Sequence, residues 1–223
     1  MPWIPGIWNQ LGTGSCVGHG VLGAVLTRLA LLGLLGEDRS PLGVYDLARC
    51  LERAALTPQG RQLPELTDDG AYPSLAWQAI QRWGVPLLSE RPLVEAEVNR
   101  EPTIGGFEQG QLWRVDGAYR VEDGDTLAIR RALASGFPVQ VASMVDDAFM
   151  DWTPDQNPIG PPDPRHELGG HAIYAVSYLS PTGPYRIVNS WGLDWGDDGT
   201  CLVSEEWLRQ AEDCYVAEVT VGP

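Results

Sequence analysis

The residues best suited to do chemistry in this chain are a cysteine, a histidine and an asparagine, in that order. Cys16 follows a Gly/Ser-rich turn at the expected start of a helix, where unpaired backbone N–H groups and the helix dipole stabilise a thiolate. His171 follows two glycines, which leave room for a ligand beside the imidazole. Asn189 ends the next apolar segment, so its amide carbonyl could accept a hydrogen bond from the imidazole and fix its tautomer.

Each of these residues also has an ordinary structural interpretation. A cysteine at a helix start can be a buried packing residue, and a single histidine at a strand start is commonly a surface or core residue. The other two histidines are less suited to act as a base. His19 lies one turn after Cys16 in the same expected helix, so we expect it to pack or cap, and His166 lies in a Pro-rich loop, where we expect it to be solvated.

Two further residues would complete a nucleophilic site. Gln10 precedes Cys16 by six residues, and its side-chain amide could donate to a developing oxyanion together with the Cys16 backbone N–H. Trp191 follows Asn189 closely and would shield the hydrogen bond between His171 and Asn189 from water.

The first half of the chain must position the cysteine, and it has the pattern of helices. A helix is expected from about Ser15 to Leu35 with Gly36 as its C-cap. Ser40-Pro41 is a typical N-cap and N1 pair for a second helix that continues through Cys50. A polar loop is expected over 57–72, and Pro73 opens a third helix that Gly84 closes.

The second half must position the histidine and the asparagine, and it has mostly the pattern of strands. A short helix is expected near 125–135, followed by a strand at 137–142 and a loop rich in Pro and Asp at 146–170. The remaining expected strands are 172–178 and 185–189, which form a hairpin around a turn at 181–184, then 201–203 and 215–221. Helices followed by strands predict an α+β fold with a cleft between the two halves.

This constellation resembles the papain-like cysteine peptidases. Asn9-Gln10 and Gly14-Ser15-Cys16 match the segment around the family's nucleophile, and Gly170-His171-Ala172 matches its histidine segment. Asn189-Ser190-Trp191-Gly192 matches its asparagine segment, and the match extends from Asn9 to about Val219. The resemblance implies the catalytic residues Cys16, His171, Asn189 and Gln10.

The resemblance also implies the architecture. It predicts one papain-like domain over 1–223, with a helical left half at approximately 14–105, a β-sheet or barrel-like right half at 106–223, the N-terminal segment crossing over, and the active-site cleft between them. Thr13 stands where the family has its first signature cysteine, so the usual disulfides are predicted to be missing. The chain also begins close to where mature members begin, which is similar to the propeptide-less bacterial or phage-type branch.

Substrate contacts follow from the same resemblance. Gly70 and Ala71 align with the strip that pairs with the substrate backbone, although Ala71 replaces a glycine there. Gly170, Ala172 and Val219 align with the main side-chain pocket, which suggests an apolar pocket; an alignment slip of one residue to Glu218 would favour a basic side chain instead. Trp191 completes the set of expected substrate-binding residues.

The sequence therefore predicts a cysteine-type peptidase that acts on peptide or protein substrates and needs no cofactor or metal. Two alternatives remain open: a catalytically silent binding module of the same fold, and a thiol-dependent acyl transferase or amidase. Five aspartates lie in the 146–170 loop, and we interpret them as a solvated rim beside the site: Asp146, Asp147, Asp151, Asp155 and Asp163.

Charge and composition limit the possible partners. The chain has 223 residues and a net charge of −15, which excludes a basic face for nucleic acid or an anionic membrane. An acidic rim beside the thiol would instead favour basic substrates. The longest apolar run, 21–35, is too short to span a bilayer and contains Arg28, and no secretory signal is present, so a cytoplasmic and possibly phage-encoded protein is expected. All 15 basic residues are arginine, for which codon bias is a simpler explanation than selection against lysine modification.

Overall fold

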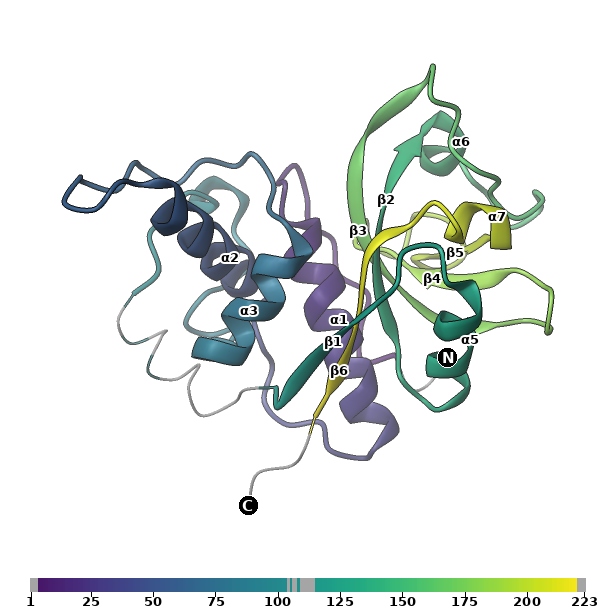
Figure 1. The fold of residues 1–223 in the computed structure, drawn as a ribbon, viewed down its shortest axis with the longest axis horizontal. Helices are drawn as coiled ribbons and strands as arrows, with labels where there is room; N and C mark the ends of the chain where they lie inside the picture. Colours follow the sequence, from purple (N-terminus) through teal and green to yellow (C-terminus); the bar gives the residue numbers. More distant parts are fainter. Residues whose placement is uncertain (1–3, 104, 106–107, 109–114, 220–223) are drawn as a thin grey trace.

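The computed structural model describes residues 4–103, 105, 108 and 115–219. It contains a group of helices on one side and an antiparallel sheet on the other, with α1 where the two meet (Figure 1). The predicted boundary between the halves, at 105 and 106, falls where most residues lie outside the described part of the chain. The helical side is built from α1 (Cys16–Leu31), α2 (Pro41–Leu56), α3 (Pro73–Trp83) and the short 3-10 helix η1 (Glu95–Glu97).

The ends of these helices follow from their local sequence. Ser40 caps α2, because its hydroxyl oxygen accepts a hydrogen bond from the Gly43 N–H at 2.8 Å. α3 begins at Pro73 and ends before Gly84, which has the positive φ of 74° that favours glycine. Both helices are as the sequence predicts.

α1 ends four residues earlier than the sequence predicts. Gly33, and not Gly36, takes the left-handed conformation, and the Leu34 N–H donates back to the Leu29 carbonyl at 2.9 Å. This pattern closes a helix by satisfying its last free carbonyls. The first glycine that could adopt a positive φ therefore terminated the helix, and the prediction of Gly36 as the cap was wrong.

The other side of the molecule is one six-stranded antiparallel sheet in the order β1-β6-β2-β3-β4-β5. Its edges, β1 and β5, are not paired to each other in the described residues, so the sheet is open and the expected barrel-like closure does not occur there. In chain order the strands are β1 (Gly117–Val121), β2 (Val139–Asp146), β3 (Glu167–Tyr178), β4 (Tyr185–Val188), β5 (Thr200–Val203) and β6 (Glu212–Glu218). Three short helices connect them: α5 (Thr126–Ala134), α6 (Asp147–Met150) and α7 (Glu205–Leu208).

The expected 146–170 loop is shorter in the structure than in the prediction. β3 begins at Glu167, because the residues before His171 continue to pair with β2 in a register that places Met144 opposite Gly170. The predicted strand at 215–221 begins earlier, at Glu212, and its last residues, 220 and 221, lie outside the described part of the chain.

The two sides are joined where α1 packs against β3. Gly23 of α1 faces the ring of Tyr174, and a Cβ at this position would overlap that ring. A Cβ at Gly20 of α1 would lie 3.1 Å from backbone atoms of Ala172 and Ile173. Because small residues let the helix approach the strand, the start of α1 and the first half of β3 lie side by side. This packing brings Cys16 and His171 to the same part of the molecule.

All four cysteines are free, which confirms that the usual family disulfides are missing. None of the described helices is long and apolar enough to cross a membrane.

Candidate active site

A cleft of about 1590 Å³ runs between the helical side and the sheet. Pockets for small molecules are generally no larger than about 1,000 Å³, so this groove has room for an extended polymer. Most of the residues predicted from the sequence line it: Gln10, Cys16, Gly70, Ala71, Gly170, His171, Ala172 and Trp191. Asn189 lies behind this lining and is buried.

Val219 does not join this set. It is not among the residues that line the cleft, and its partly buried side chain packs against the core cluster of the helical side. The strand before it, β6, is held between β1 and β2, which leaves Ala211 and Glu212 at its other end to line the cleft.

Cys16 is the first residue of α1, as the sequence predicts. Burial raises the pKa of its thiol, while the backbone N–H groups of Ala172, Val17 and Cys16 itself act in the opposite direction because they stabilise the thiolate. The contact with Ala172 shows that the thiol faces β3 beside His171. The thiol therefore has backbone donors around it that can stabilise negative charge.

His171 and Asn189 form a buried hydrogen-bonded pair. The imidazole Nε2 donates to Asn189 Oδ1 at 2.8 Å, and the same oxygen accepts from the Ser190 N–H at 2.7 Å. Because the backbone N–H can only donate, the amide oxygen must face both groups, which assigns the proton of His171 to Nε2 and leaves Nδ1 unprotonated. Burial lowers the pKa of His171 to about 4, whereas the hydrogen bond that His171 donates to Asn189 acts in the opposite direction.

Aromatic rings enclose this pair. Trp191 stacks on the imidazole, with ring centroids 4.7 Å apart and planes inclined by 21°. Phe149 of α6 meets the imidazole edge-on at 5.9 Å. These rings restrict access of water to the hydrogen bond, as predicted for Trp191; Phe149 was not identified from the sequence, where it lay in the expected loop.

Gln10 is held at both ends of its side-chain amide. Its Nε2 donates to the Thr13 carbonyl at 2.7 Å, and its Oε1 accepts from the Ser190 hydroxyl at 2.6 Å. The backbone N–H of Gln10 also donates to the Ser190 carbonyl at 2.7 Å, so the N-terminal segment crosses to the sheet side. The amide has a second N–H at Nε2, and Gln10 lines the cleft near Cys16.

The other two histidines lie as the sequence predicts. His19 is buried in α1, where its Nδ1 contacts the Ser15 carbonyl at 2.9 Å and its ring packs edge-on against Trp8. Burial lowers the pKa of His19 to about 4. His166 is exposed, and its Nδ1 lies 3.5 Å from a carboxylate oxygen of Asp163.

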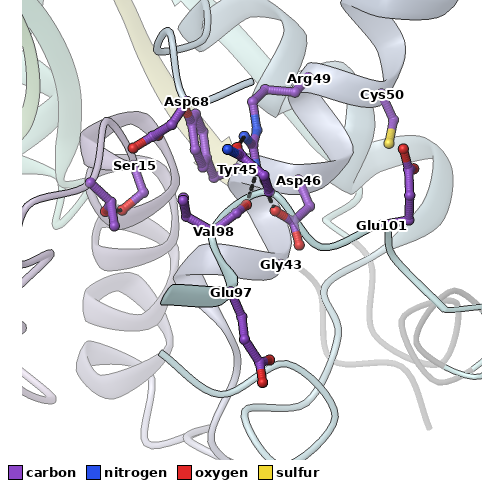
Figure 2. Close-up of polar contacts among 12 residues, drawn as sticks. Ser15, Gly43, Tyr45, Asp46, Arg49, Cys50, Asp68, Glu97, Val98 and Glu101 are labelled. Carbon is purple, nitrogen blue, oxygen red and sulfur yellow. Dashed lines mark hydrogen bonds and ion pairs between the residues drawn. The ribbon is translucent and has the colours of Figure 1, made fainter. Parts of the chain in front are cut away.

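A polar network beside the cleft was missed in the sequence. The carboxylate of Asp68 accepts hydrogen bonds from the hydroxyl of Tyr45 in α2 and from the Gly14 N–H, and Figure 2 shows Asp68 and Tyr45 beside the start of α1 at Ser15. The sequence places Asp68 only in the expected polar loop over 57–72, because local patterns do not reveal contacts between residues 54 positions apart.

Acidic residues line both walls of the cleft, but the five aspartates predicted from the 146–170 loop are not among them. The five aspartates of that loop are absent from the lining; Asp146, for example, is buried and accepts hydrogen bonds from the backbone N–H groups of Phe149 and Asp163. The acidic residues that do line the cleft are Glu52, Glu65, Asp68, Asp69, Asp123, Glu167, Glu212 and Asp213. The acidic lining therefore consists of other residues than the predicted aspartates, and the prediction that Asp146 is solvated was wrong because its side chain is buried.

The three arginines in the lining do not offset this charge, because each contacts a carboxylate. Arg49 pairs with Asp46 at 2.7 Å, Arg53 pairs with Glu101, and Arg209 pairs with Glu205 at 2.7 Å.

Comparison with known proteins places this geometry in context. The family profile described as papain family cysteine protease matches residues 3–223. Cathepsin B-like CP3 of Giardia intestinalis is 28% identical over 232 residues, covering 98% of this chain and 69% of that protein. A peptidase C1-like protein of Acanthamoeba polyphaga mimivirus is 37% identical over 168 residues; the match covers 70% of this chain and only 54% of the viral protein.

Solved structures show the same fold. Xylellain, a cysteine protease from Xylella fastidiosa, superposes with a TM-score of 0.80 at 21% identity, covering 96% of this chain and 83% of that one. The bromelain protease from Ananas comosus, solved with the E64 inhibitor, superposes with a TM-score of 0.74 at 18% identity, covering 99% and 98% of the two chains. At these identities the likeness concerns the fold alone.

Proposed function

Because the chain belongs to the papain family of cysteine proteases, we propose that it hydrolyses peptide bonds with Cys16 as nucleophile, His171 as base and acid, Asn189 as orienting residue and Gln10 as oxyanion donor. The observation that carries this proposal is the shared cleft, in which Cys16 at the start of α1 and an imidazole oriented by Asn189 both form the lining.

In the first half-reaction, Cys16 attacks the carbonyl carbon of the scissile bond. His171 is neutral above a pH of about 4, so its unprotonated Nδ1 can accept the thiol proton as the sulfur–carbon bond forms. The carbonyl oxygen becomes an oxyanion and receives hydrogen bonds from the Cys16 N–H and the Gln10 amide. His171 then gives its proton to the leaving amine as the carbon–nitrogen bond breaks.

In the second half-reaction, water replaces the amine. His171 accepts a proton from the water molecule, which attacks the thioester carbonyl and forms a second tetrahedral intermediate. Collapse of this intermediate breaks the sulfur–carbon bond, releases the carboxylic acid and returns the proton to the thiol. Asn189 holds the imidazole in one orientation throughout, because its oxygen is also bonded to the Ser190 N–H.

An extended peptide is the substrate that best fits the cleft. Gly70 and Ala71 on one wall and Gly170 and Ala172 on the other present small side chains, which leave backbone groups accessible for strand-like pairing. Exposed apolar side chains also line the cleft, namely Tyr72, Met144 and Leu168, so we propose apolar side-chain contacts without Val219.

Replacing the nucleophile tests this function. Cys16→Ala is expected to abolish turnover of a peptide library while the thermal unfolding midpoint stays near that of the wild type. A thiol-directed peptide epoxide should label wild type once, at Cys16, and the variant not at all. Retained turnover in Cys16→Ala would exclude the assignment.

The same assay separates the alternatives. A silent binding module would retain peptide binding in a wild-type protein that neither cleaves nor reacts with the epoxide. An acyl transferase would give products of higher mass when an amine acceptor is added, whereas a hydrolase gives the free acid.

A further inference from the structure

Asp68 connects three segments that meet beside the proposed nucleophile. Its two carboxylate oxygens accept from the Gly14 N–H at 3.0 and 3.1 Å, and one of them also accepts from the Tyr45 hydroxyl at 2.8 Å. The Tyr45 oxygen in turn accepts from the Gly70 N–H at 3.0 Å. The turn before Cys16, helix α2 and the loop before α3 are therefore joined by hydrogen bonds at one point, and Figure 2 shows Asp68 and Tyr45 of this cluster beside Ser15.

This cluster is closely packed and its hydrogen-bonding roles are fixed. Tyr45 is fully buried, and a Cβ at Gly14 would lie 3.1 Å from an Asp68 oxygen and 3.2 Å from the Tyr45 hydroxyl. Burial raises the pKa of Tyr45, and the hydrogen bond to Asp68 raises it further, so the phenol remains a donor. Each hydrogen bond to Asp68 needs an oxygen that accepts it. A carboxylate has two such oxygens, whereas the amide of an asparagine has only one.

No covalent bond holds the turn in place. Thr13 stands where the family has its first signature cysteine, and its hydroxyl donates to the Gln10 carbonyl at 2.7 Å. All four cysteines of the chain are free, so no disulfide anchors the turn. The contacts of the Gly14 N–H with Asp68 are the hydrogen bonds that tie this turn, in the described structure, to the loop containing Gly70 and Ala71.

We infer that Asp68 and Tyr45 are positioning residues, which hold the Gly14 turn behind Cys16 and the Gly70–Ala71 strip in a fixed mutual geometry. The inference rests on the proposed function, because the turn carries the nucleophile and the strip is proposed to pair with the substrate. Asp68 acts on the turn directly, whereas Tyr45 acts on both Asp68 and the strip. The two residues should therefore affect different kinetic constants.

A simple electrostatic role predicts the opposite effect. The negative charge of Asp68 raises the pKa of Cys16, although burial is the main cause of that shift. If Asp68 acted only through this charge, its removal would increase the thiolate fraction and speed up alkylation of Cys16 near neutral pH. Loss of a positioning contact should instead slow turnover, because small displacements of reacting groups reduce rates steeply.

The test compares Asp68→Asn, Asp68→Ala and Tyr45→Phe with wild type and with Asp38→Asn, an exposed carboxylate outside the cleft lining. We expect Asp68→Ala to lower kcat by about tenfold or more, with a smaller loss for Asp68→Asn, which keeps one acceptor. Tyr45→Phe should raise KM about fivefold, the effect of losing a hydrogen bond of ordinary strength.

Two alkylating reagents separate positioning from stability. Iodoacetamide is small and reports on the thiol alone, whereas a peptide epoxide also needs the strip; both are followed at Cys16 by mass mapping, because Cys50 is partly exposed too. Tyr45→Phe should slow the epoxide more than iodoacetamide, with all assays run well below each unfolding midpoint.

The outcomes are decisive whichever variants fold. Folded Asp68 and Tyr45 variants with wild-type kcat, KM and labelling ratio would overturn the inference, and so would faster alkylation with unchanged turnover in Asp68→Asn. If Asp68→Ala does not fold, Asp68→Asn and the isosteric Tyr45→Phe decide the question alone. An inactive wild type, or an active Cys16→Ala, would instead count against the proposed function.

Discussion

The side-chain amide of Gln10 is held by hydrogen bonds at both its oxygen and its nitrogen. Its oxygen accepts from Ser190 and its nitrogen donates to Thr13, so the orientation of the amide, which has one further N–H, is fixed before substrate binds. A donor fixed in advance costs little reorganisation when charge develops on the substrate oxygen.

Gln10→Ala should therefore lower kcat by about 10²–10³-fold with little change in KM, because an oxyanion donor acts mainly in the transition state. Steady-state kinetics on one peptide would measure this. Gln78→Ala, on the exposed face of α3, is the matched control and should behave as wild type. A rise in KM at constant kcat would assign Gln10 to ground-state binding instead.

Two buried histidines make the folded protein sensitive to acid. Burial holds the pKa of both His19 and His171 at about 4, below the ordinary value of 6.5, so the unfolded chain binds protons between these values that the folded chain does not. The contribution of these two histidines to the free energy of unfolding is therefore fully present above pH 6.5. It is lost as pH falls towards 4, at up to about 1.4 kcal/mol per pH unit for each histidine.

His19→Gln should make the free energy of unfolding less dependent on pH in this range. Urea unfolding between pH 6.5 and 5 would show a slope reduced by up to the contribution of one histidine. Gln78→Ala is the control, since this exposed side chain carries no ionisable group. An unaltered slope in His19→Gln would mean that the buried ring is protonated in the native state.

At the scale of elements, α1 determines where the thiol meets the strand that carries the imidazole. Gly20 and Gly23 face β3, and the close approach at Gly23 and Tyr174 leaves no space for a side chain. The start of α1 is thus held against the sheet by packing, while the turn before it is held by polar contacts.

Gly23→Ala should destabilise the protein by about 1–3 kcal/mol despite the higher helix propensity of alanine, because the new methyl group must displace a buried ring. Chemical denaturation would give the value, and Gly36→Ala is the control, since an added Cβ there would have no atom within 4 Å apart from those of Gly36 and its chain neighbours. A stabilised Gly23→Ala variant would show that Tyr174 moves away at low cost.

The elements also show which parts of the fold were predictable. The bounds of α2 and α3 follow from Ser40-Pro41, Pro73 and Gly84, because caps are local signals. The start of β3 depends on pairing with β2, which local sequence does not encode, so strand residues were included in the predicted loop. The contact of Asp68 with Gly14 likewise exists only after folding.

Among the site residues, too, those marked by a local motif were predicted better than the one placed without a motif. Cys16, His171 and Gln10 were identified by motifs and line one cleft, whereas Val219 was placed by alignment in a segment without such a motif and lies outside the lining. The roles of the motif residues stay predictions until the variants are measured.

At the scale of the whole molecule, the net charge of −15 is partly concentrated at the cleft. Acidic residues line both walls, and the arginines among them contact carboxylates. A groove that is lined by charges of one sign and has low-dielectric walls attracts ligands of the opposite charge, and salt screens this attraction.

Cationic peptides should therefore be cleaved with a higher kcat/KM than neutral peptides that have the same residues at the scissile bond. Because the Debye length falls from about 20–30 Å at low salt to a few Å near 1 M, this ratio should drop several-fold as salt rises from about 0.02 M to about 0.5 M. The charged peptide residues are placed away from the scissile bond, so that the comparison reports on the field of the cleft and not on one pocket.

Variants locate the source of this preference. Glu52→Gln combined with Glu65→Gln removes two carboxylates from the cleft and should reduce both the preference and its salt dependence. Asp151→Asn combined with Glu206→Gln removes the same charge from exposed positions outside the lining and should leave both nearly unchanged. If the two double variants weaken the preference equally, the total charge of the molecule and not its arrangement attracts the substrate, and a ratio independent of salt would exclude electrostatic attraction altogether.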